Sequence, residues 1–136
     1  MNIKIITQEK IGKPFIKKGI KEYEKRLSRY CKIKYISVKK VEDLKKYLKE
    51  KTYLIIVHPG EKMISSENFA EHFQQLGLTG KSDIVFFLCS QDLSYQKAHS
   101  YLSLTSMNIE IELATLILYE QIYRAFTILH HLPYHK

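Results

Sequence analysis

The chain has 136 residues, 45% of them hydrophobic and 26% charged, which is enough to bury the core of one domain spanning residues 1–136. No apolar run approaches the roughly 18 residues of a membrane span, and the opening stretch MNIKIITQEK lacks the apolar region of a secretory signal. The two cysteines, Cys31 and Cys89, lie far apart and form no CxxC pair. This usage excludes a disulfide framework, disfavours structural zinc and predicts a cytoplasmic protein.

The net charge of +8 is unevenly distributed along the chain. Residues 1–51 hold 17 Lys and Arg against 6 Asp and Glu, whereas residues 52–136 hold 5 against 8. A basic half joined to a mildly acidic half favours a polyanionic partner, most simply RNA, DNA or a phosphate-rich surface. The alternative is that the lysines only keep helix surfaces soluble.

The first half of the chain alternates between strand and helix. NIKII (2–6) is a short apolar strand, and Pro14 suits the first turn of a helix whose apolar positions recur at helical spacing up to Tyr30. The opposite face of that helix carries Lys17, Lys18, Lys21, Lys25, Arg26 and Arg29. KIKYISV (32–38) alternates as a second strand, and VEDLKKYLKE (41–50) has the spacing of a short helix.

The second half continues the alternation. YLIIV (53–57) and DIVFFL (83–88) are continuous apolar runs, the pattern of strands buried on both faces. Between them, SSENFAEHFQQLG (65–77) begins with serines suited to capping a helix. CSQDLSYQKAHSY (89–101) is predicted as a loop with a short helix, LSLTS (102–106) as a last short strand, and the remainder as one long helix.

This order of elements predicts an α/β domain whose sheet is mostly parallel, with about five strands and helices on both faces. Ligands of such sheets bind beyond the carboxyl ends of the strands. The segments that follow strands three, four and five are HPGE (58–61), CSQDLS (89–94) and TSMNIEIE (105–112). We therefore expect a binding site among these three segments.

The last stretch, EQIYRAFTILHHLPYHK (120–136), is chemically rich for a chain end. Glu120 and Arg124 are four positions apart, so they share a helix face and can pair. A helix followed by a solvated tail is the simpler interpretation, and a site is the other. The three histidines of this segment lack a nearby Cys or a spaced Asp to complete a usual ligand set, so we expect no metal.

Four stretches together resemble one family, and the resemblance runs in order along essentially the whole chain. They are EYEKRL (22–27), KMISSE (62–67), SDIVFFL (82–88) and LYEQIYRAFTI…PYHK (118–136). The chain is similar to the RlmH family, bacterial 23S rRNA pseudouridine N3-methyltransferases of the SPOUT, or α/β-knot, superfamily. The resemblance implies a C-terminal trefoil knot, a homodimer, and S-adenosylmethionine (SAM) held in the knot at the dimer interface.

The resemblance also implies which residues carry the chemistry. The last three residues match the terminal triplet of the family, which lies near the methyl acceptor. His135 is then the candidate proton acceptor for N3 of the pseudouridine, because an imidazole titrates near neutral pH. Tyr134 would stack on or orient the base, while Arg124 and Lys136 would hold phosphate or the negative charge that develops on the ring.

The same match places the cofactor and the RNA. Val57 ends the third strand, and Cys89 follows the fourth. The counterpart of the family's adenine-binding loop is Leu104, Thr105, Ser106, Met107, Asn108 and Ile109. The rRNA phosphates are expected at Lys17, Lys18, Lys21, Lys25, Arg29 and Lys136. A solvated helix face is an equally good interpretation of any single lysine.

The chain departs from the family pattern in the cofactor loops. A glycine-rich turn follows the fourth strand in the family, and CSQDL (89–93) stands there in this chain. The family's Pro, His, Gln and Arg before and within the last helix are replaced by Glu110, Ile111, Glu112 and Thr115. Two functions follow: an active SAM-dependent rRNA methyltransferase, or a knot-fold homologue with weak or no SAM binding that serves as an RNA- or ribosome-binding protein.

Overall fold

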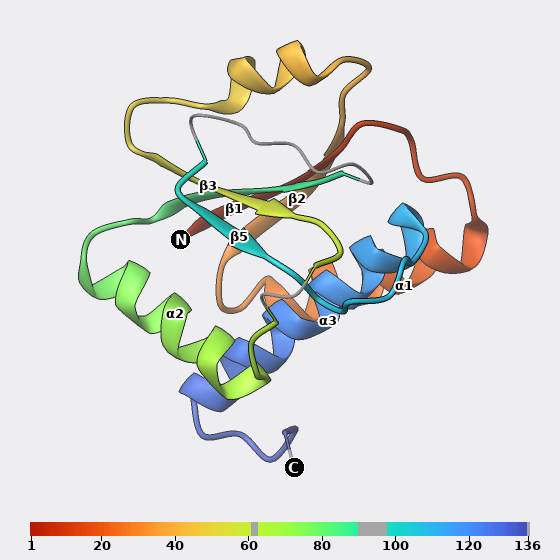
Figure 1. Cartoon of the computed structure of the whole chain (residues 1–136). Coiled ribbons are helices and arrows are strands. Elements are labelled where there is room, and N and C mark those ends of the chain that lie inside the picture. Colours follow the sequence, from red (N-terminus) through yellow and green to blue (C-terminus); the bar gives the residue numbers. More distant parts are fainter. Residues whose placement is uncertain (61–62, 90–97, 136) are drawn as a thin grey trace.

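The computed structural model describes residues 1–60, 63–89 and 98–135 (Figure 1). The strands are β1 (Asn2–Thr7), β2 (Lys32–Ser37), β3 (Thr52–Val57), β4 (Asp83–Leu88) and β5 (Ser100–Leu102). The helices are α1 (Pro14–Leu27), the 3₁₀ helix η1 (Val41–Tyr47), α2 (Ser66–Leu78) and α3 (Ile111–Leu129). Within the described ranges, no helix is both long and apolar enough to cross a membrane.

The five strands form one sheet in the order β2-β1-β4-β3-β5, and every pairing is parallel. The predicted parallel α/β sheet is therefore confirmed. Leu88 of β4 lies opposite both Thr7 of β1 and Val57 of β3, and Val57 in turn lies opposite Leu102 of β5. The carboxyl ends of these four strands therefore meet at one edge, where ligands of parallel sheets bind.

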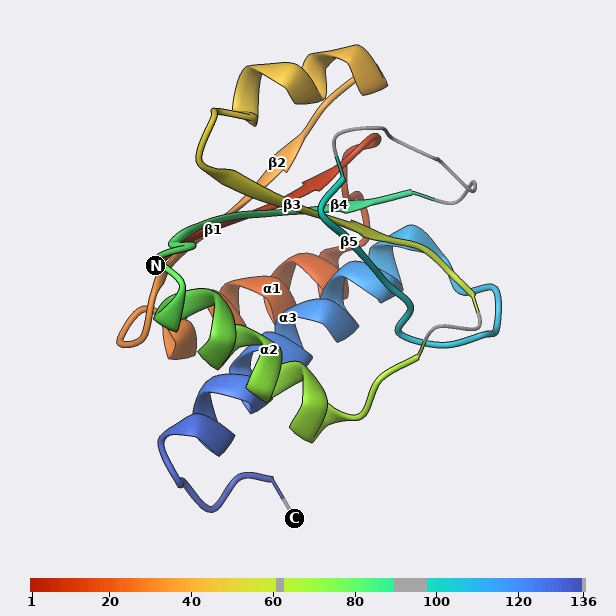
Figure 2. The same ribbon diagram turned by 60° about the vertical axis from the view of Figure 1, so that its left-hand side comes forward.

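Helices cover both faces of the sheet, but unequally. The three α-helices pack together on one face, and η1 lies on the other (Figure 2). Successive residues of β4 alternate between the two cores: Ile84 and Phe86 pack toward the α-helices, whereas Val85 and Phe87 pack with Leu44 of η1. The strand is therefore buried on both faces, as its continuous apolar run predicted.

Two elements differ from the sequence-based expectation. Residues 41–50 were predicted as a short helix, but only Val41–Tyr47 is helical, and it is a 3₁₀ helix that buries Leu44, because so short a segment has few contacts that favour a full α-helix. The last strand begins at Ser100, earlier than the predicted 102–106, because it pairs with β3 in the register Ile55↔Ser100. The short helix predicted within 89–101 falls largely outside the described residues.

Helix α3 is the central helix of the α-helical layer, between α1 and α2 (Figure 2). Gly19 of α1 allows close packing here, since a Cβ at that position would lie 2.7 Å from Cδ1 of Leu116. The fully buried Tyr119 donates its hydroxyl hydrogen to Oε2 of Glu24 over 2.8 Å. Burial also raises the pKa of Tyr119 well above its ordinary value, so the phenol stays protonated.

Candidate functional site

A small apolar cavity lies at the carboxyl edge of the sheet, where the segments after β3, β4 and β5 meet the first turn of α3. Its lining consists of Val57, His58, Pro59, Leu88, Cys89, Leu104, Thr105, Ile109, Ile111 and Ala114. Five of the eight predicted cofactor residues are thus brought together. The other three, Ser106, Met107 and Asn108, are exposed and do not line the cavity.

Backbone hydrogen bonds hold the walls of this cavity in place. The N–H of Cys89 donates to the carbonyl of Val57 over 3.1 Å, which joins the ends of β4 and β3. The N–H of Gly60 donates to the carbonyl of Thr105 over 3.4 Å, and this bond joins the segment after β3 to the loop after β5. Cys89 itself is buried, so its thiol serves as a wall of the cavity.

The chemistry of the walls fits the adenine part of SAM, because apolar side chains and backbone groups suit a flat heteroaromatic ring. The volume of the cavity is only ≈ 20 Å³, about what one water molecule needs. Binding of the whole cofactor therefore requires the walls to move apart. The middle of the loop of residues 104–109 lies outside the cavity and is exposed, with Met107 71% exposed.

A second, roomier cleft of ≈ 160 Å³ lies beside the first cavity. Leu104 lines both spaces. The remaining walls are Ile64, Ser65, Ser66, Phe69, Leu102, Ser103, Ile117 and Gln121. Hydroxyl and amide groups therefore face this cleft along with apolar ones, and Gln121 connects it to the cluster at the end of the chain.

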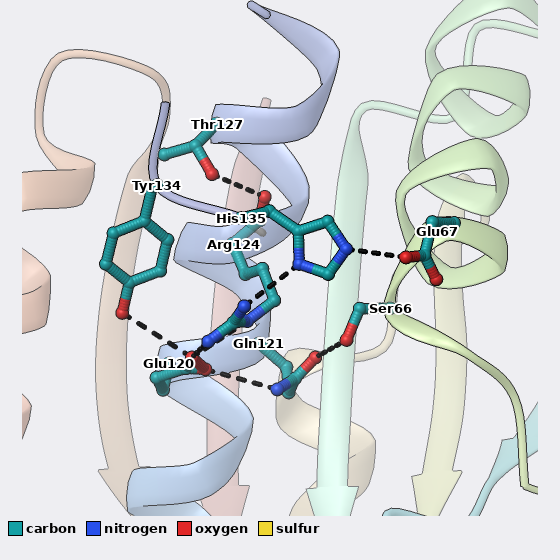
Figure 3. Close-up of polar contacts among 8 residues, drawn as sticks. All are labelled: Ser66, Glu67, Glu120, Gln121, Arg124, Thr127, Tyr134 and His135. Atoms are coloured by element: carbon teal, nitrogen blue, oxygen red, sulfur yellow. Dashed lines mark hydrogen bonds and ion pairs between the residues drawn. The ribbon is translucent and has the colours of Figure 1, made fainter. Parts of the chain in front are cut away.

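The three predicted catalytic residues lie together at the far end of α3 (Figure 3). Arg124 donates from Nε and Nη2 to Oε1 of Glu120 over 2.9 and 2.6 Å. Cζ of Arg124 lies 5.1 Å from the ring centre of Tyr134, a cation–π arrangement. The hydrogen bond to Glu120 raises the pKa of Arg124, and burial raises the pKa of Tyr134. Both groups therefore keep their protons at neutral pH.

His135 completes the cluster and bridges two helices. Its Nδ1 lies 2.9 Å from Nη1 of Arg124 on α3, and its Nε2 lies 2.5 Å from Oε1 of Glu67 on α2 (Figure 3). Sequence reasoning did not single out Glu67, although the stretch KMISSE that contains it carried part of the family resemblance. Gln121 was missed as well; it accepts from Ser66 over 2.7 Å and donates to Glu120 over 3.1 Å.

Five of the predicted RNA-binding residues are exposed. Lys17, Lys18, Lys21 and Lys25 lie on α1, and Arg29 lies just after its end. The sixth predicted residue, Lys136, lies outside the described residues. Over the described ranges, no group of three or more His, Cys, Asp and Glu side chains is placed to hold a metal ion.

A parallel sheet with an apolar cavity at its carboxyl edge, beside the loop that leads into the last helix, defines a small α/β protein of the class that binds ligands at this edge. Comparison of the sequence with family models identifies the class. The chain belongs to the SPOUT methyltransferase family, whose model, described as "Predicted SPOUT methyltransferase", matches residues 1–135.

Individual relatives are similar to this chain over their whole length. The chain is 39% identical over 137 residues to "Ribosomal RNA large subunit methyltransferase H 1" of Thermoanaerobacter sp. (strain X514), with 100% of both chains covered. It is 36% identical over 159 residues to "Ribosomal RNA large subunit methyltransferase H" of Latilactobacillus sakei subsp. sakei (strain 23K), again with 100% of both covered. The family resemblance found from the motifs is confirmed.

Proposed function

We propose that this protein is a SAM-dependent methyltransferase that modifies N3 of a pseudouridine in 23S ribosomal RNA of the large subunit. The observation that carries the proposal is the assembly of Arg124, Tyr134 and His135 into one cluster. This cluster occurs in a chain that is similar, over its full length, to proteins named as ribosomal RNA large subunit methyltransferases.

The cavity at the carboxyl edge of the sheet is the proposed cofactor site. Val57, Cys89, Leu104, Thr105 and Ile109 would hold the adenosine part, and the exposed residues 106–108 would close over it when the loop moves. SAM, when bound, supplies a methyl group activated by the positive sulfonium. The apolar walls exclude water, which strengthens the electrostatic interactions of the reacting groups.

The cluster at the end of α3 is the proposed acceptor site. N3 of the base has to lose its proton before it can take up a methyl group, and His135 is the proposed proton acceptor. The raised pKa of Tyr134 makes its phenol a poor base at neutral pH, which suits it for stacking on the nucleobase instead. Arg124, with Lys136, offsets the negative charge that develops on the ring.

The distance between the two halves supports a homodimer as part of the proposal. Ala114 at the cavity and Arg124 in the cluster are separated by about 15 Å along α3, whereas the reacting atoms have to approach to about 3–3.5 Å. Two copies arranged so that the tail of one meets the cavity of the other would satisfy this need. The C-terminal trefoil knot belongs to the same proposal, since it follows from the family.

The basic surface of α1 is the proposed contact with the ribosome. Its lysines are exposed, and they would supply affinity by contacting rRNA phosphates and not base edges. Specificity for one nucleotide would then come from the acceptor site.

The test is methyl transfer from isotopically labelled SAM to large ribosomal subunits that lack the modification, followed by mass spectrometry of the nucleosides. We expect methylpseudouridine with the wild type and none with His135→Ala. Absence of the product with the wild type would reject the proposed activity.

The second candidate function is RNA or ribosome binding without catalysis. The observation that favours it is the small size of the cofactor cavity, ≈ 20 Å³. Calorimetry separates the two: micromolar binding of SAM supports the enzyme, whereas no heat at millimolar SAM, together with retained binding to ribosomes, supports the second candidate. Ile109→Glu, which puts a carboxylate into the apolar cavity, should weaken SAM binding by at least about tenfold if this is the site.

A further inference from the structure

Three consecutive residues at the start of α2 each make a different contact. Ser65 caps the helix by accepting from the N–H of Asn68 over 3.0 Å. Ser66 donates to the amide oxygen of Gln121, and Glu67 contacts His135 (Figure 3). The start of α2 is therefore bound both to α3 and to the C-terminal tail, and the contact with the tail is made by Glu67.

The partners of His135 determine which of its ring nitrogens carries the proton. A guanidinium has only N–H groups to offer, so Nδ1, facing Arg124 at 2.9 Å, has to be the acceptor. The proton of the neutral ring is then on Nε2, which donates to the carboxylate of Glu67 over 2.5 Å. If the proton moved to Nδ1, two donors would face each other at Arg124.

Glu67 is well suited to hold this arrangement. Its side chain is 62% exposed, yet it reaches an imidazole that is only 23% exposed. The hydrogen bond from His135 lowers the pKa of Glu67, so the group is an ionised acceptor at neutral pH. Glu67 lies in the first turn of α2, where the partial positive charge of the helix N-terminus stabilises a carboxylate.

We infer that Glu67 is a positioning residue for His135, holding the imidazole in the Nε2–H tautomer and tying the C-terminal tail to α2. As a role in methyl transfer, this rests on the proposed function. Glu67 does not line the proposed cofactor cavity, and its side chain contacts His135, so it acts through His135.

The two contacts of the His135 ring also suggest how this residue would accept a proton. Both ring nitrogens are occupied, Nδ1 by Arg124 and Nε2 by Glu67. When Arg124 turns toward the negative charge of the RNA, the lone pair of Nδ1 becomes available. The proton would then pass from N3 of the base to Nδ1. The N3 electron pair would attack the methyl carbon of SAM as the C–S bond breaks, and the electrons of that bond would stay on the sulfur, which leaves as a neutral thioether. The carboxylate of Glu67 offsets the positive charge of the imidazolium.

Four proteins test the inference: the wild type, Glu67→Ala, Glu67→Gln and Glu71→Gln. Glu71 is exposed one turn further along α2, so Glu71→Gln removes the same charge from the same helix and serves as the matched control. The amide introduced by Glu67→Gln keeps an oxygen that can accept from Nε2–H, whereas the methyl group introduced by Glu67→Ala has no acceptor. The readouts are the ¹⁵N spectrum of the His135 imidazole and kcat and KM of methyl transfer to rRNA.

We expect the wild type, Glu67→Gln and Glu71→Gln to show the Nε2–H tautomer. In Glu67→Ala the tail loses its contact with α2, so the imidazole can leave Arg124, and we expect exchange between tautomers. For Glu67→Ala, kcat should fall by at least about tenfold, with KM little changed and with partial rescue in Glu67→Gln. An unchanged spectrum or an unchanged kcat in Glu67→Ala would overturn the inference, as would an equal loss in the control. If the wild type itself transfers no methyl group, the proposed activity is rejected, and the spectra alone decide whether Glu67 positions His135.

Discussion

The ion pair of Glu120 and Arg124 is the centre of the cluster, and its strength can be measured with a double-mutant cycle. The four proteins are the wild type, Glu120→Ala, Arg124→Ala and the double variant. The cycle isolates the coupling of the two side chains because each single variant removes the same interaction. A strong coupling is expected if the pair orders the tail, and a weak one if the pair is an ordinary surface contact.

The geometry indicates the size of the coupling. Exposed pairs at this helical spacing contribute about 0.3–0.5 kcal/mol, whereas hydrogen bonds to charged groups contribute about 1.5–3 kcal/mol when well shielded. Arg124 makes two such bonds to one carboxylate oxygen, and the two side chains are 25% and 20% exposed. The remaining exposure leaves some screening by solvent, so we expect a coupling of about 1 kcal/mol.

Urea denaturation of the four proteins measures this coupling. The chain offers a matched comparison in the pair of Glu22 and Arg26 on α1, which has the same spacing but a single bond of 3.0 Å and side chains 52% and 44% exposed. The same cycle at that pair should give a smaller coupling. If the coupling at Glu120 and Arg124 is no larger than at Glu22 and Arg26, the pair does not order the cluster.

Three further predictions concern the stability of the core, the proposed RNA contact of α1 and the dependence of stability on pH. Tyr119→Phe leaves a carboxylate without its donor, so the free energy of unfolding in urea should fall by about 1–2 kcal/mol with SAM binding unchanged. Lys17→Glu combined with Lys21→Glu should weaken binding to ribosomes and reduce its salt dependence by about two phosphate contacts; an unchanged salt dependence would remove α1 from the interface. The lowered pKa of Glu67 means that its contact stabilises the fold above the ordinary carboxyl pKa and is lost as pH falls through the lowered value. The stability difference between wild type and Glu67→Gln should therefore be present at pH 7 and should decrease as pH falls below the ordinary carboxyl range.

The central strands were predictable because burial on both faces leaves an unmistakable pattern. The run expected at 83–88 is β4 itself, and the run expected at 53–57 differs from β3 by one residue. β5 is only three residues long, and its position depends on pairing with β3, a contact that no local pattern encodes. The strand was therefore found as an element but placed too late in the chain.

The site was predictable to the extent that it depends on local spacing or on strand ends. The pairing of Glu120 with Arg124 follows from a spacing of four, and the segment that begins at Cys89 follows from the rule for parallel sheets. Val57 was predicted from the family resemblance. The contact between Glu67 and His135 joins positions 68 apart, so it depends on how α2 packs against α3. Periodicity cannot reveal such a contact, and only the resemblance of KMISSE to the family pointed to this stretch.

The acidic residues Glu110 and Glu112, which replace the family's pattern at the start of α3, have a structural use in this chain. The carboxylate of Glu112 accepts from the backbone N–H groups of Gly12 and Lys13, just before α1, and Glu110 forms an ion pair with the Lys13 side chain. These hydrogen bonds lower the pKa of Glu112, so it stays ionised at neutral pH. The charges of Glu110 and Glu112 are therefore partly offset by the Lys13 side chain. The same contacts join the start of α3, which follows the 104–109 loop, to the segment just before α1, and the replaced motif therefore still supports one wall of the proposed cofactor cavity.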